Sequence, residues 1–435
     1  MLGPQCAVMA YAAGCGWTAF QKVPITPKRT SIDVIATYGG RFSEALPLSP
    51  IIPTQFIYIV KIYEYKRFIA YNYIVVMFIG GGKLRDRMTP KERGLASYYL
   101  EEPDRVPMDF WADESVWRRL LEEMKLRSRE ELLKKLHIDF RHCYWAGDLG
   151  AVENYPDGGF KDWWGVIHDR KGIPKVHPLA DIRSPEELEL YEWPDPDRVD
   201  YHAIAEMVER YAEEYVVYGG AWSPIFFVAL GLMGVENFFR YAFTSPEIIH
   251  RLLDIITDFY HEVSKRIFDL CAKDIDIFFM GDDYGTQTGL FLSPKMFRIF
   301  FKPRLERLFK LAKKYGLLVQ LHSCGSIREI IPDLIEIGLD GLDPIQVGAA
   351  HMSVEDIKRE FGDKICLHGS LDTQKTLPFG TPADVKREVL HRLKTVAQGG
   401  GFVLAPSQVF LPEIPTENII TMYRVGYEYG YYPFE

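Results

Sequence analysis

The chain has 435 residues, of which 47% are hydrophobic and 14% aromatic, so it can bury a large core in one to three domains. Its net charge is -9 at pH 7 and it contains no block of lysine or arginine, which argues against nucleic acid as the main partner. The six cysteines lack the spacing of a disulfide framework, so we expect a reduced, cytoplasmic protein.

The first 87 residues differ in pattern from the rest of the chain. Residues 56–80 are apolar and aromatic, but four charged residues interrupt them, so no continuous membrane span is predicted: Lys61, Glu64, Lys66 and Arg67. The start of the chain also lacks the basic residues and apolar run of a signal peptide.

A helix start follows Met88, with Thr89 as the N-cap, Pro90 in the first helical position and Glu92 three residues after the cap. We therefore predict that residues 88–435 form the functional domain. Residues 1–87 are predicted to be an N-terminal extension that is either not native or poorly ordered. A membrane-surface anchor is the alternative interpretation of this segment.

Residues 88–435 alternate short apolar runs with longer amphipathic stretches, which indicates repeated βα units. We predict eight strands, at residues 106–110, 137–140, 215–218, 275–280, 317–321, 339–342, 364–367 and 401–404. Eight such units favour a (β/α)8 TIM-type barrel. A doubly wound open sheet is the alternative, and the absence of Gly-x-Gly-x-x-Gly after the first strand counts against it.

Several helix starts carry a capping hydroxyl directly before a proline, namely Ser184, Ser245, Ser293 and Thr381. Ser128 and Glu131 have the spacing of a capping box. The helix after Ser293 should break or kink at Pro303.

A long insertion, at about residues 147–200, follows the second predicted strand. Residues 162–167 and 173–176 flank a glycine-containing turn and are predicted to form a hairpin. In a barrel such an insertion lies over the catalytic mouth, so we interpret it as a lid, with a dimer contact as the alternative.

Polar residues cluster where the predicted strands end. They are Asp139 and Arg141 at the second strand, Asp282, Asp283 and Gln287 after the fourth, His322 and Cys324 after the fifth, Asp343 and Gln346 after the sixth, His368 and Asp372 after the seventh, and Ser407 and Gln408 after the eighth. Buried polar groups cost free energy unless they are paired, and the active site of a barrel lies at these strand ends. The pattern therefore predicts a functional site.

His322 and Cys324 are predicted metal ligands, because zinc takes nitrogen and sulfur ligands. An ordinary histidine beside an inert buried thiol is the alternative. Candidate catalytic groups are Asp282, Asp283, His368 and Asp139. The remaining polar side chains are candidate substrate-binding residues: Arg141, Gln287, Gln346, Asp372, Ser407 and Gln408.

Structural roles stay open for several of these residues. Asp282 and Asp283 could cap the segment that follows them, and Asp372 could cap a helix. His368 could be a core histidine, and Asp139 could form an ion pair with Arg141.

Several motifs occur in the order found in a known superfamily. They are Gly281–Gln287, Ser293–Phe297, Leu321–Gly325, Asp343–Gln346, His368–Asp372 and Pro415–Asn418. Residues 88–435 thereby resemble the uroporphyrinogen decarboxylase superfamily. The resemblance implies a (β/α)8 barrel, often dimeric, and one of two activities. Some members decarboxylate uroporphyrinogen without a cofactor, and others use zinc to transfer methyl groups between a corrinoid protein and a thiol.

The resemblance separates these two branches at a few positions. The decarboxylase branch has an arginine-rich segment where this chain has only Arg105, and a histidine where it has Gln408. Its key aspartate could correspond to Asp139. The methyltransferase branch has the motif that His322 and Cys324 match, but its third ligand, a cysteine after the eighth strand, is absent here.

A third ligand would then come from Asp282, Asp283, His368 or Asp343. We therefore expect a zinc enzyme that acts on a small-molecule substrate and a corrinoid protein. A cofactor-free decarboxylase and a non-catalytic tetrapyrrole-binding barrel are the alternatives.

Overall fold

The computed structural model describes residues 86–147 and 150–434 in full and, before them, only the backbone of four strands. The chain divides into two compact units, Met1–Arg85 and Asp86–Glu435. In the first unit β1 (Gln5–Cys6) pairs antiparallel with β2 (Val23–Pro24), and β3 (Phe56–Lys66) pairs antiparallel with β4 (Ile69–Ile79). The prediction that residues 1–87 are not native or are poorly ordered falls largely on residues outside this description.

The second unit is built around a curled sheet of seven parallel strands, in the spatial order β15-β14-β13-β12-β11-β10-β5. The strands are β5 (Phe140–His142), β10 (Val216–Gly219), β11 (Ile277–Gly281), β12 (Leu318–His322), β13 (Gly341–Asp343), β14 (Cys366–Leu371) and β15 (Phe402–Pro406). They correspond to the second to eighth predicted strands, and six of those predictions are confirmed to within a few residues. The second, predicted at residues 137–140, is displaced, because β5 begins only at Phe140.

The first predicted strand, at residues 106–110, is reduced to a single parallel bridge between Met108 and Leu404. The N–H of Asp109 donates to the Leu404 oxygen at 3.1 Å, and the N–H of Asp139 donates to the Met108 oxygen at 2.9 Å. Pro107 has no N–H to contribute, which limits regular pairing. This segment nevertheless bonds both edges of the sheet and closes the ring, which confirms the TIM-type barrel.

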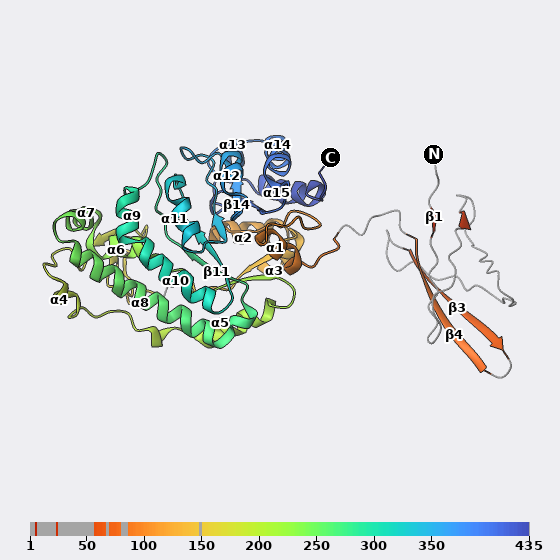
Figure 1. The fold of residues 1–435 in the computed structure, drawn as a ribbon, viewed down its shortest axis with the longest axis horizontal. Coiled ribbons are helices and arrows are strands. Elements are labelled where there is room, and N and C mark those ends of the chain that lie inside the picture. Colours follow the sequence, from red (N-terminus) through yellow and green to blue (C-terminus); the bar gives the residue numbers. More distant parts are fainter. Residues whose placement is uncertain are drawn as a thin grey trace. The chain divides into compact units, whose positions relative to one another are not determined.

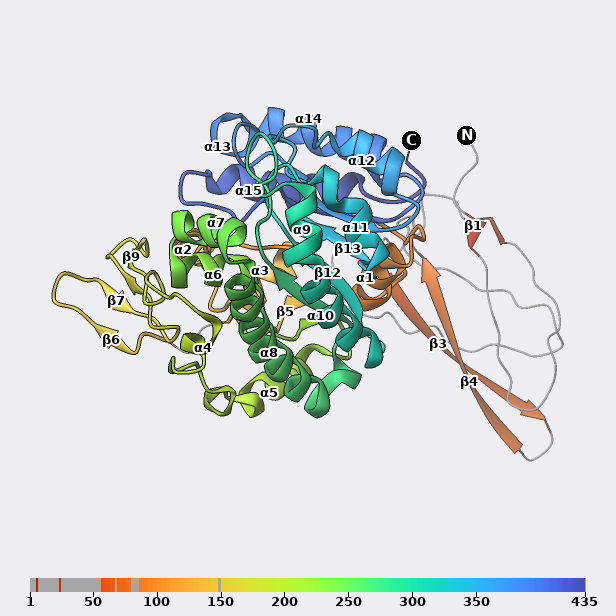
Figure 2. The same ribbon diagram turned by 60° about the vertical axis from the view of Figure 1, so that its left-hand side comes forward.

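Helices cover the outside of this barrel (Figures 1 and 2). They are α1 (Pro90–Tyr98), α2 (Glu114–Glu123), α3 (Arg129–Lys135), α4 (Pro185–Leu188), α5 (Tyr201–Tyr211), α6 (Ile225–Met233), α7 (Val235–Thr244), α8 (Pro246–Cys271), α9 (Pro294–Phe300), α10 (Lys302–Lys314), α11 (Ile331–Glu336), α12 (Val354–Phe361), α13 (Thr376–Phe379), α14 (Pro382–Arg392) and α15 (Thr416–Tyr429).

The predicted helix starts are confirmed. Each expected capping residue is the N-cap of a helix: Thr89, Ser128, Ser184, Ser245, Ser293 and Thr381. The break at Pro303 is also confirmed, because α9 ends at Phe300 and α10 begins at Lys302. Among the described residues no single helix is long and apolar enough to cross a membrane, and only α6 and α7, bent by 99°, meet those criteria as a pair.

Apolar side chains fill the interior of the barrel. Phe140, Tyr218, Phe279 and Val403 form one buried cluster with Tyr98, which comes from the end of α1. A Cβ atom at Gly341 would lie 2.6 Å from the Tyr98 ring, so this glycine makes room for the tyrosine near the amino ends of the strands. The polar groups at the carboxyl ends of the strands therefore lie above an apolar floor.

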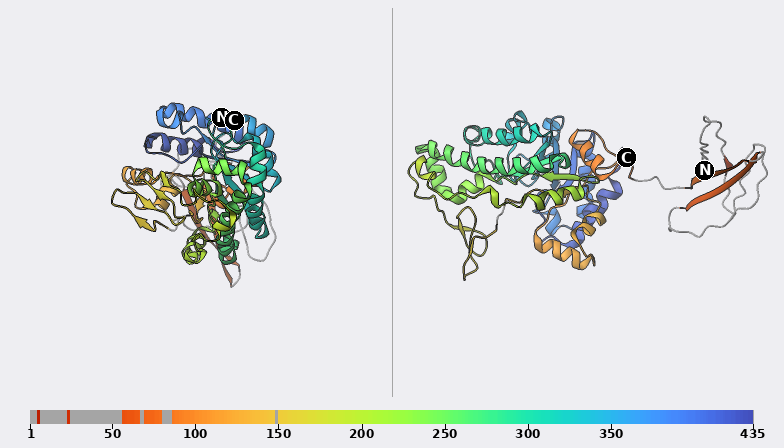
Figure 3. Two further views of the ribbon diagram at one scale, coloured as in Figure 1. Left: turned by 90° about the vertical axis from the view of Figure 1, so that its left-hand side faces the viewer. Right: turned by 90° about the horizontal axis from the view of Figure 1, so that it is seen from below.

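The insertion after β5 forms a small antiparallel sheet that projects from the barrel (Figures 2 and 3). Its strands are β6 (Glu153–Asn154), β7 (Phe160–Lys161), β8 (Ile167–His168) and β9 (Pro174–Val176). The pairing of β8 with β9 confirms the predicted hairpin. The roles of lid or dimer contact stay predictions.

Candidate active site

His322 and Cys324 converge at the carboxyl end of β12. The Sγ atom of Cys324 lies 3.4 Å from Nε2 of His322, and both residues are buried. Gly325 follows with a φ of 86°, which a residue with a side chain rarely adopts, and its N–H donates to Oε1 of Gln346 at 2.6 Å. The loop is thus held in the turn that brings the sulfur back toward the imidazole.

Asp283 completes a group of three candidate ligands. Its Oδ1 atom lies 3.8 Å from Nε2 of His322 and accepts the N–H of Cys324 at 2.7 Å. The ligand atoms of these three residues all lie within 4.8 Å of one another. Nitrogen, sulfur and carboxylate oxygen are the donors that zinc takes in proteins, so the donor set suits that ion.

Asp282 lies in a different environment from its neighbour. Its carboxylate accepts the N–H groups of Phe226 at 2.6 Å and Phe227 at 3.2 Å, at the start of α6, and the hydroxyl of Tyr284 at 2.9 Å. Burial raises the pKa of Asp282 to about 7. Asp282 therefore caps a helix, although not the segment that directly follows it, and it turns away from the group formed by Asp283.

Asp343 connects two histidines. Its Oδ2 atom lies 2.6 Å from Nδ1 of His322, and its Oδ1 atom lies 2.6 Å from Nδ1 of His368. The chain of contacts continues from Nε2 of His368 to Asp109 at 3.0 Å and from Asp109 to Nε2 of His142 at 3.0 Å. Carboxylates and imidazoles thus alternate across the mouth of the barrel.

The charges along this chain shift one another's pKa values. Burial alone would lower the pKa of His322, but Cys324 and Asp343 raise it well above its usual value. Burial also opposes the charge on His368, whose pKa Asp343 and Asp109 raise to about 9. For Asp343 burial acts in the opposite direction, and the two histidines lower its pKa to about 2. Each carboxylate therefore favours the charged form of the histidines that it contacts.

Two aromatic rings pack against His322. The ring of Trp111 lies 4.9 Å from the imidazole, edge to face, and the ring of Trp222 lies 5.4 Å from it, measured between centroids. A Cβ atom at Gly281 would lie 2.1 Å from Trp222, so the glycine at the end of β11 admits that ring. An adjoining cavity is lined by Asp109, Phe110, Trp111, His142, Phe279, His322, Asp343, His368, Ala405, Pro406 and Gln408.

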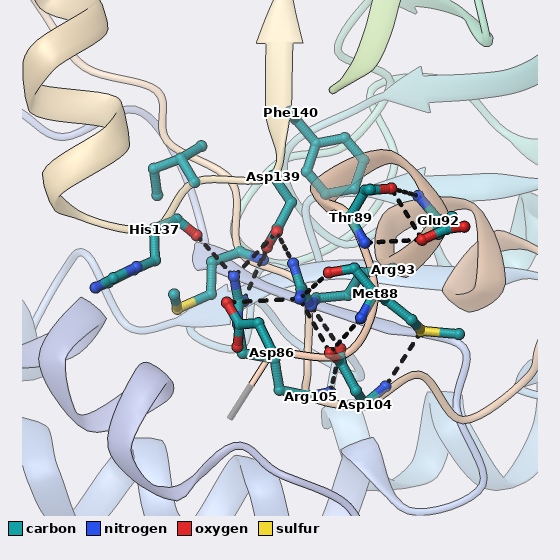
Figure 4. Close-up of polar contacts among 12 residues, drawn as sticks. Asp86, Met88, Thr89, Glu92, Arg93, Asp104, Arg105, His137, Asp139 and Phe140 are labelled. Carbon is teal, nitrogen blue, oxygen red and sulfur yellow. Dashed lines mark hydrogen bonds and ion pairs between the residues drawn. The ribbon is translucent and has the colours of Figure 1, made fainter. Parts of the chain in front are cut away.

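Asp139 lies away from this cavity, before the start of β5 (Figure 4). It is fully buried and bonds Nη1 of Arg93 at 2.7 Å, Nη1 of Arg105 at 2.9 Å and the N–H of Met108 at 2.8 Å. These contacts link α1 to the segment that closes the barrel. The catalytic role predicted for Asp139 gains no support from them.

The alternative ion pair between Asp139 and Arg141 is wrong, because Arg141 bonds Glu130 at 2.8 Å instead. The guanidinium of Arg141 also lies 3.5 Å from the centroid of the Tyr215 ring. Alternate residues of a strand point to opposite faces, so residues 139 and 141 point away from the face of Phe140, which lies in the barrel interior.

The other five candidate substrate-binding residues lie in different surroundings. Gln408 lines the cavity, and Gln346 holds the loop at Gly325. Gln287 is exposed, and Asp372 accepts N–H groups of the turn before α13. Ser407 is buried, with its hydroxyl 3.1 Å from that of Thr373. Their substrate-binding roles stay predictions.

Sequence reasoning missed Asp109, His142 and Trp111. The available signal was strand alternation, since His142 shares the inward face of Phe140. Asp109 and Trp111 follow the shortened first strand, where the sequence shows no motif.

Comparisons with known proteins identify the family of this chain. A family model described as uroporphyrinogen decarboxylase (URO-D) matches residues 165–429. A methylcobamide:CoM methyltransferase, MtaA of Methanosarcina barkeri, is 26% identical over 228 residues, which are 52% of this chain and 62% of that protein. A methylated-thiol–coenzyme M methyltransferase of Methanosarcina mazei is 29% identical over 42% of this chain and 46% of that protein.

A uroporphyrinogen decarboxylase of Xylella fastidiosa is 28% identical over 37% of this chain and 42% of its own length. The chain thus spans less than two thirds of the length of these relatives. Among solved structures, a methyltransferase from Methanosarcina mazei has a TM-score of 0.57 at 22% identity and covers 79% of this chain and 99% of its own. That likeness supports the barrel fold.

Proposed function

This chain belongs to the uroporphyrinogen decarboxylase family, and within that family we propose that it is a zinc enzyme that transfers a methyl group between a corrinoid protein and a thiol. The observation that carries the proposal is the convergence of Nε2 of His322 and Sγ of Cys324 at 3.4 Å. The similarity to corrinoid methyltransferases supports it.

The geometry of the three side chains suits zinc. Bonds of about 2.3 Å to sulfur and about 2.1 Å to nitrogen at a tetrahedral angle would hold the two ligand atoms about 3.6 Å apart. We propose Asp283 as the third ligand, in place of the cysteine that the methyltransferase branch has after the last strand. Three protein ligands would leave one position for a substrate, as catalytic zinc sites require.

Hydrogen bonds from neighbouring residues orient the proposed ligands. Asp343 accepts a hydrogen bond from Nδ1 of His322, which would leave Nε2 as the ligating nitrogen when a metal ion displaces its proton. Asp283 and Gln346 accept hydrogen bonds from the backbone of the Cys324 loop, and the Trp111 ring packs edge to face against the imidazole. A bound zinc ion would lower the pKa of a substrate thiol so that thiolate exists at neutral pH.

The overall transfer is balanced without a redox partner. The sulfur–carbon bond forms as the cobalt–carbon bond breaks, the electron pair of the broken bond stays on cobalt, and the thiol proton leaves to solvent. The corrinoid protein is therefore a substrate. It would bind in its methylated form and leave without the methyl group.

The decarboxylase alternative has weaker support in the site. Arg105, the one arginine in the segment where that branch has several, bonds Asp139 and the oxygen of His137. No arginine or lysine is among the described residues that line the cavity. A substrate with many carboxylates would lack the bidentate partners that bind such groups well.

Metal analysis of the full chain tests the proposal. We expect about one zinc per chain, lost in His322→Ala and Cys324→Ala and weakened in Asp283→Ala. Cys271→Ala is the matched control, since that buried thiol lies at the end of α8, and it should retain zinc. Absence of zinc binding, or turnover of uroporphyrinogen by the purified protein, would contradict the proposal.

A further inference from the structure

His368, in β14, lies between two carboxylates at the mouth of the barrel. Its Nδ1 atom is 2.6 Å from Oδ1 of Asp343, at the end of β13, and its Nε2 atom is 3.0 Å from Oδ2 of Asp109, in the segment that closes the barrel. All three side chains are buried. An ionised carboxylate only accepts hydrogen bonds, so both ring nitrogens of His368 must carry a proton. This geometry holds His368 as an imidazolium.

Both carboxylates have further donors that favour their ionised form. Asp109 accepts the N–H of Phe110 at 2.7 Å, and its Oδ1 atom lies 3.0 Å from Nε2 of His142. Burial would raise the pKa of Asp109, but His142 and His368 outweigh burial and lower it. The two histidines on Asp343 lower its pKa in the same way, to about 2. The positive charge therefore stays on His368 and the negative charges stay on the carboxylates.

His142 is bound differently, although it lines the same cavity. Its Nε2 atom contacts Asp109, but its Nδ1 atom has no hydrogen-bond partner among the residues that the structure describes. A second proton on His142 would be left without an acceptor, so the neutral ring satisfies this position. No lysine or arginine is among the described lining residues. The histidines are therefore the source of positive charge in this cavity, and His368 is the one that two carboxylates hold in the charged form.

The charge of His368 offsets one of two negative charges behind the proposed metal ligand. Asp343 joins His368 to His322, because each of its oxygens contacts one of these rings. A ligating imidazole is neutral, so His322 contributes no charge once it binds a metal. Asp343, His368 and Asp109 then carry one negative charge in total, whereas a neutral residue in place of His368 would leave two. Buried charges are screened poorly, so the second negative charge would oppose a thiolate at the metal.

We propose that, given the proposed function, His368 is a positioning residue whose fixed positive charge favours the thiolate form of the acceptor at the metal. It also acts through Asp343, since its hydrogen bond draws negative charge toward Oδ1 and weakens Oδ2 as an acceptor for His322. A weaker acceptor makes His322 a less basic ligand, and a thiol bound beside it is then more acidic. Both effects have the same sign, so removal of this charge should raise the pH at which the thiolate forms.

Cobalt in place of zinc makes the bound thiolate visible, because sulfur-to-cobalt charge transfer absorbs light. The full chain is loaded with Co²⁺ and given a fixed concentration of 2-mercaptoethanol or 2-mercaptoethanesulfonate, and the pH at which half of the band has formed is recorded. His368→Gln keeps a hydrogen-bonding side chain but removes the charge. We expect its midpoint to lie about one pH unit higher for both thiols, the size expected for a unit charge within about 10 Å at an effective dielectric constant of about 20 to 30.

A second substitution separates charge from structure. Asp109→Asn, added to His368→Gln, removes one of the two remaining negative charges, so the midpoint should return toward that of the wild type. A purely structural role predicts the opposite, because the double variant has lost a further native partner. His391→Gln is the matched control, since that histidine lies on α14 and pairs with Glu355. Its midpoint should equal that of the wild type.

Nitrogen-15 NMR of the metal-free full chain, labelled at histidine, tests the charge itself. At neutral pH both ring nitrogens of His368 should give the signals of protonated nitrogen, and these signals should be absent from His368→Gln. A His368 ring with one unprotonated nitrogen would overturn the inference. This result would not affect the proposed function, because neither metal nor thiol is present.

The cobalt experiment also distinguishes the two proposals. An equal midpoint in the wild type and His368→Gln would overturn the inference and leave a thiol acceptor intact. A midpoint that rises further in the double variant would do the same. A cobalt spectrum that neither thiol changes at any pH would overturn the thiol acceptor and, with it, the role of His368.

Discussion

Replacing Asp343 by Asn should separate the charge of this residue from its shape. Each carboxylate oxygen of Asp343 lies 2.6 Å from Nδ1 of a different histidine, His322 or His368. An amide offers only one acceptor oxygen, and its NH2 group can only donate. One histidine must therefore change tautomer or lose its partner.

The consequence for the metal follows from the tautomer of His322. When Nδ1 no longer donates to an acceptor, Nε2 carries the proton for part of the time and cannot ligate. Losing such a partner typically lowers metal affinity about 10- to 100-fold, which is about 1.4 to 2.7 kcal/mol. We expect Asp343→Asn to lose zinc affinity by this amount.

Competition with a chromophoric chelator at fixed pH measures the affinity, and circular dichroism checks that the variant is folded. Asp372→Asn is the matched control, because that rim carboxylate only accepts N–H groups of the turn before α13. His368→Gln leaves Asp343 charged and should have a smaller effect. A folded Asp343→Asn protein with the zinc affinity of the wild type would refute this reasoning.

Three further predictions concern stability, measured by denaturant unfolding. Arg93→Ala leaves Asp139 buried with one partner fewer and should lower the free energy of unfolding by about 3 to 5 kcal/mol. Breaking the exposed pair of Arg129 and Glu114 should lower it by less than about 1 kcal/mol. Equal losses of stability would contradict this prediction. Burial would raise the pKa of Asp104, but Arg93 and two backbone N–H groups outweigh burial and lower it. The ionised Asp104 therefore stabilises the folded state above about pH 4, and this stabilisation is lost as the pH falls further. Asp104→Asn should flatten that acid dependence, and an unchanged slope would count against it. Asp282→Ala removes the acceptor for two N–H groups of α6 and should cost about 1 to 3 kcal/mol while zinc content is retained; loss of zinc would place Asp282 in the metal site.

Periodicity and capping chemistry were enough to predict most of the barrel. Six strands and the helix starts from Thr89 to Thr381 lie close to where the apolar runs and the capping motifs placed them, and β5 is displaced toward the carboxyl end of its predicted range. The segment at residues 106–110 was harder, because its pairing depends on two distant edges of the sheet and Pro107 removes one donor.

The candidate site could be predicted only in part. His322 and Cys324 were identifiable because two residues of one strand end share a face. Asp109 and His142 were not, since their role depends on contacts across the closed barrel that no local spacing encodes. At β5 the prediction chose the wrong face of the strand. It favoured Asp139 and Arg141, which point away from the barrel interior, over His142, which points into it.

Anomalous diffraction at the zinc edge, from crystals of the zinc-replete full chain, tests the central claim most directly. The account predicts one strong peak about 2.3 Å from Sγ of Cys324 and about 2.1 Å from Nε2 of His322, with Asp283 as the third protein ligand. A map with no peak between these atoms, or with the zinc bound elsewhere in the chain, would contradict it.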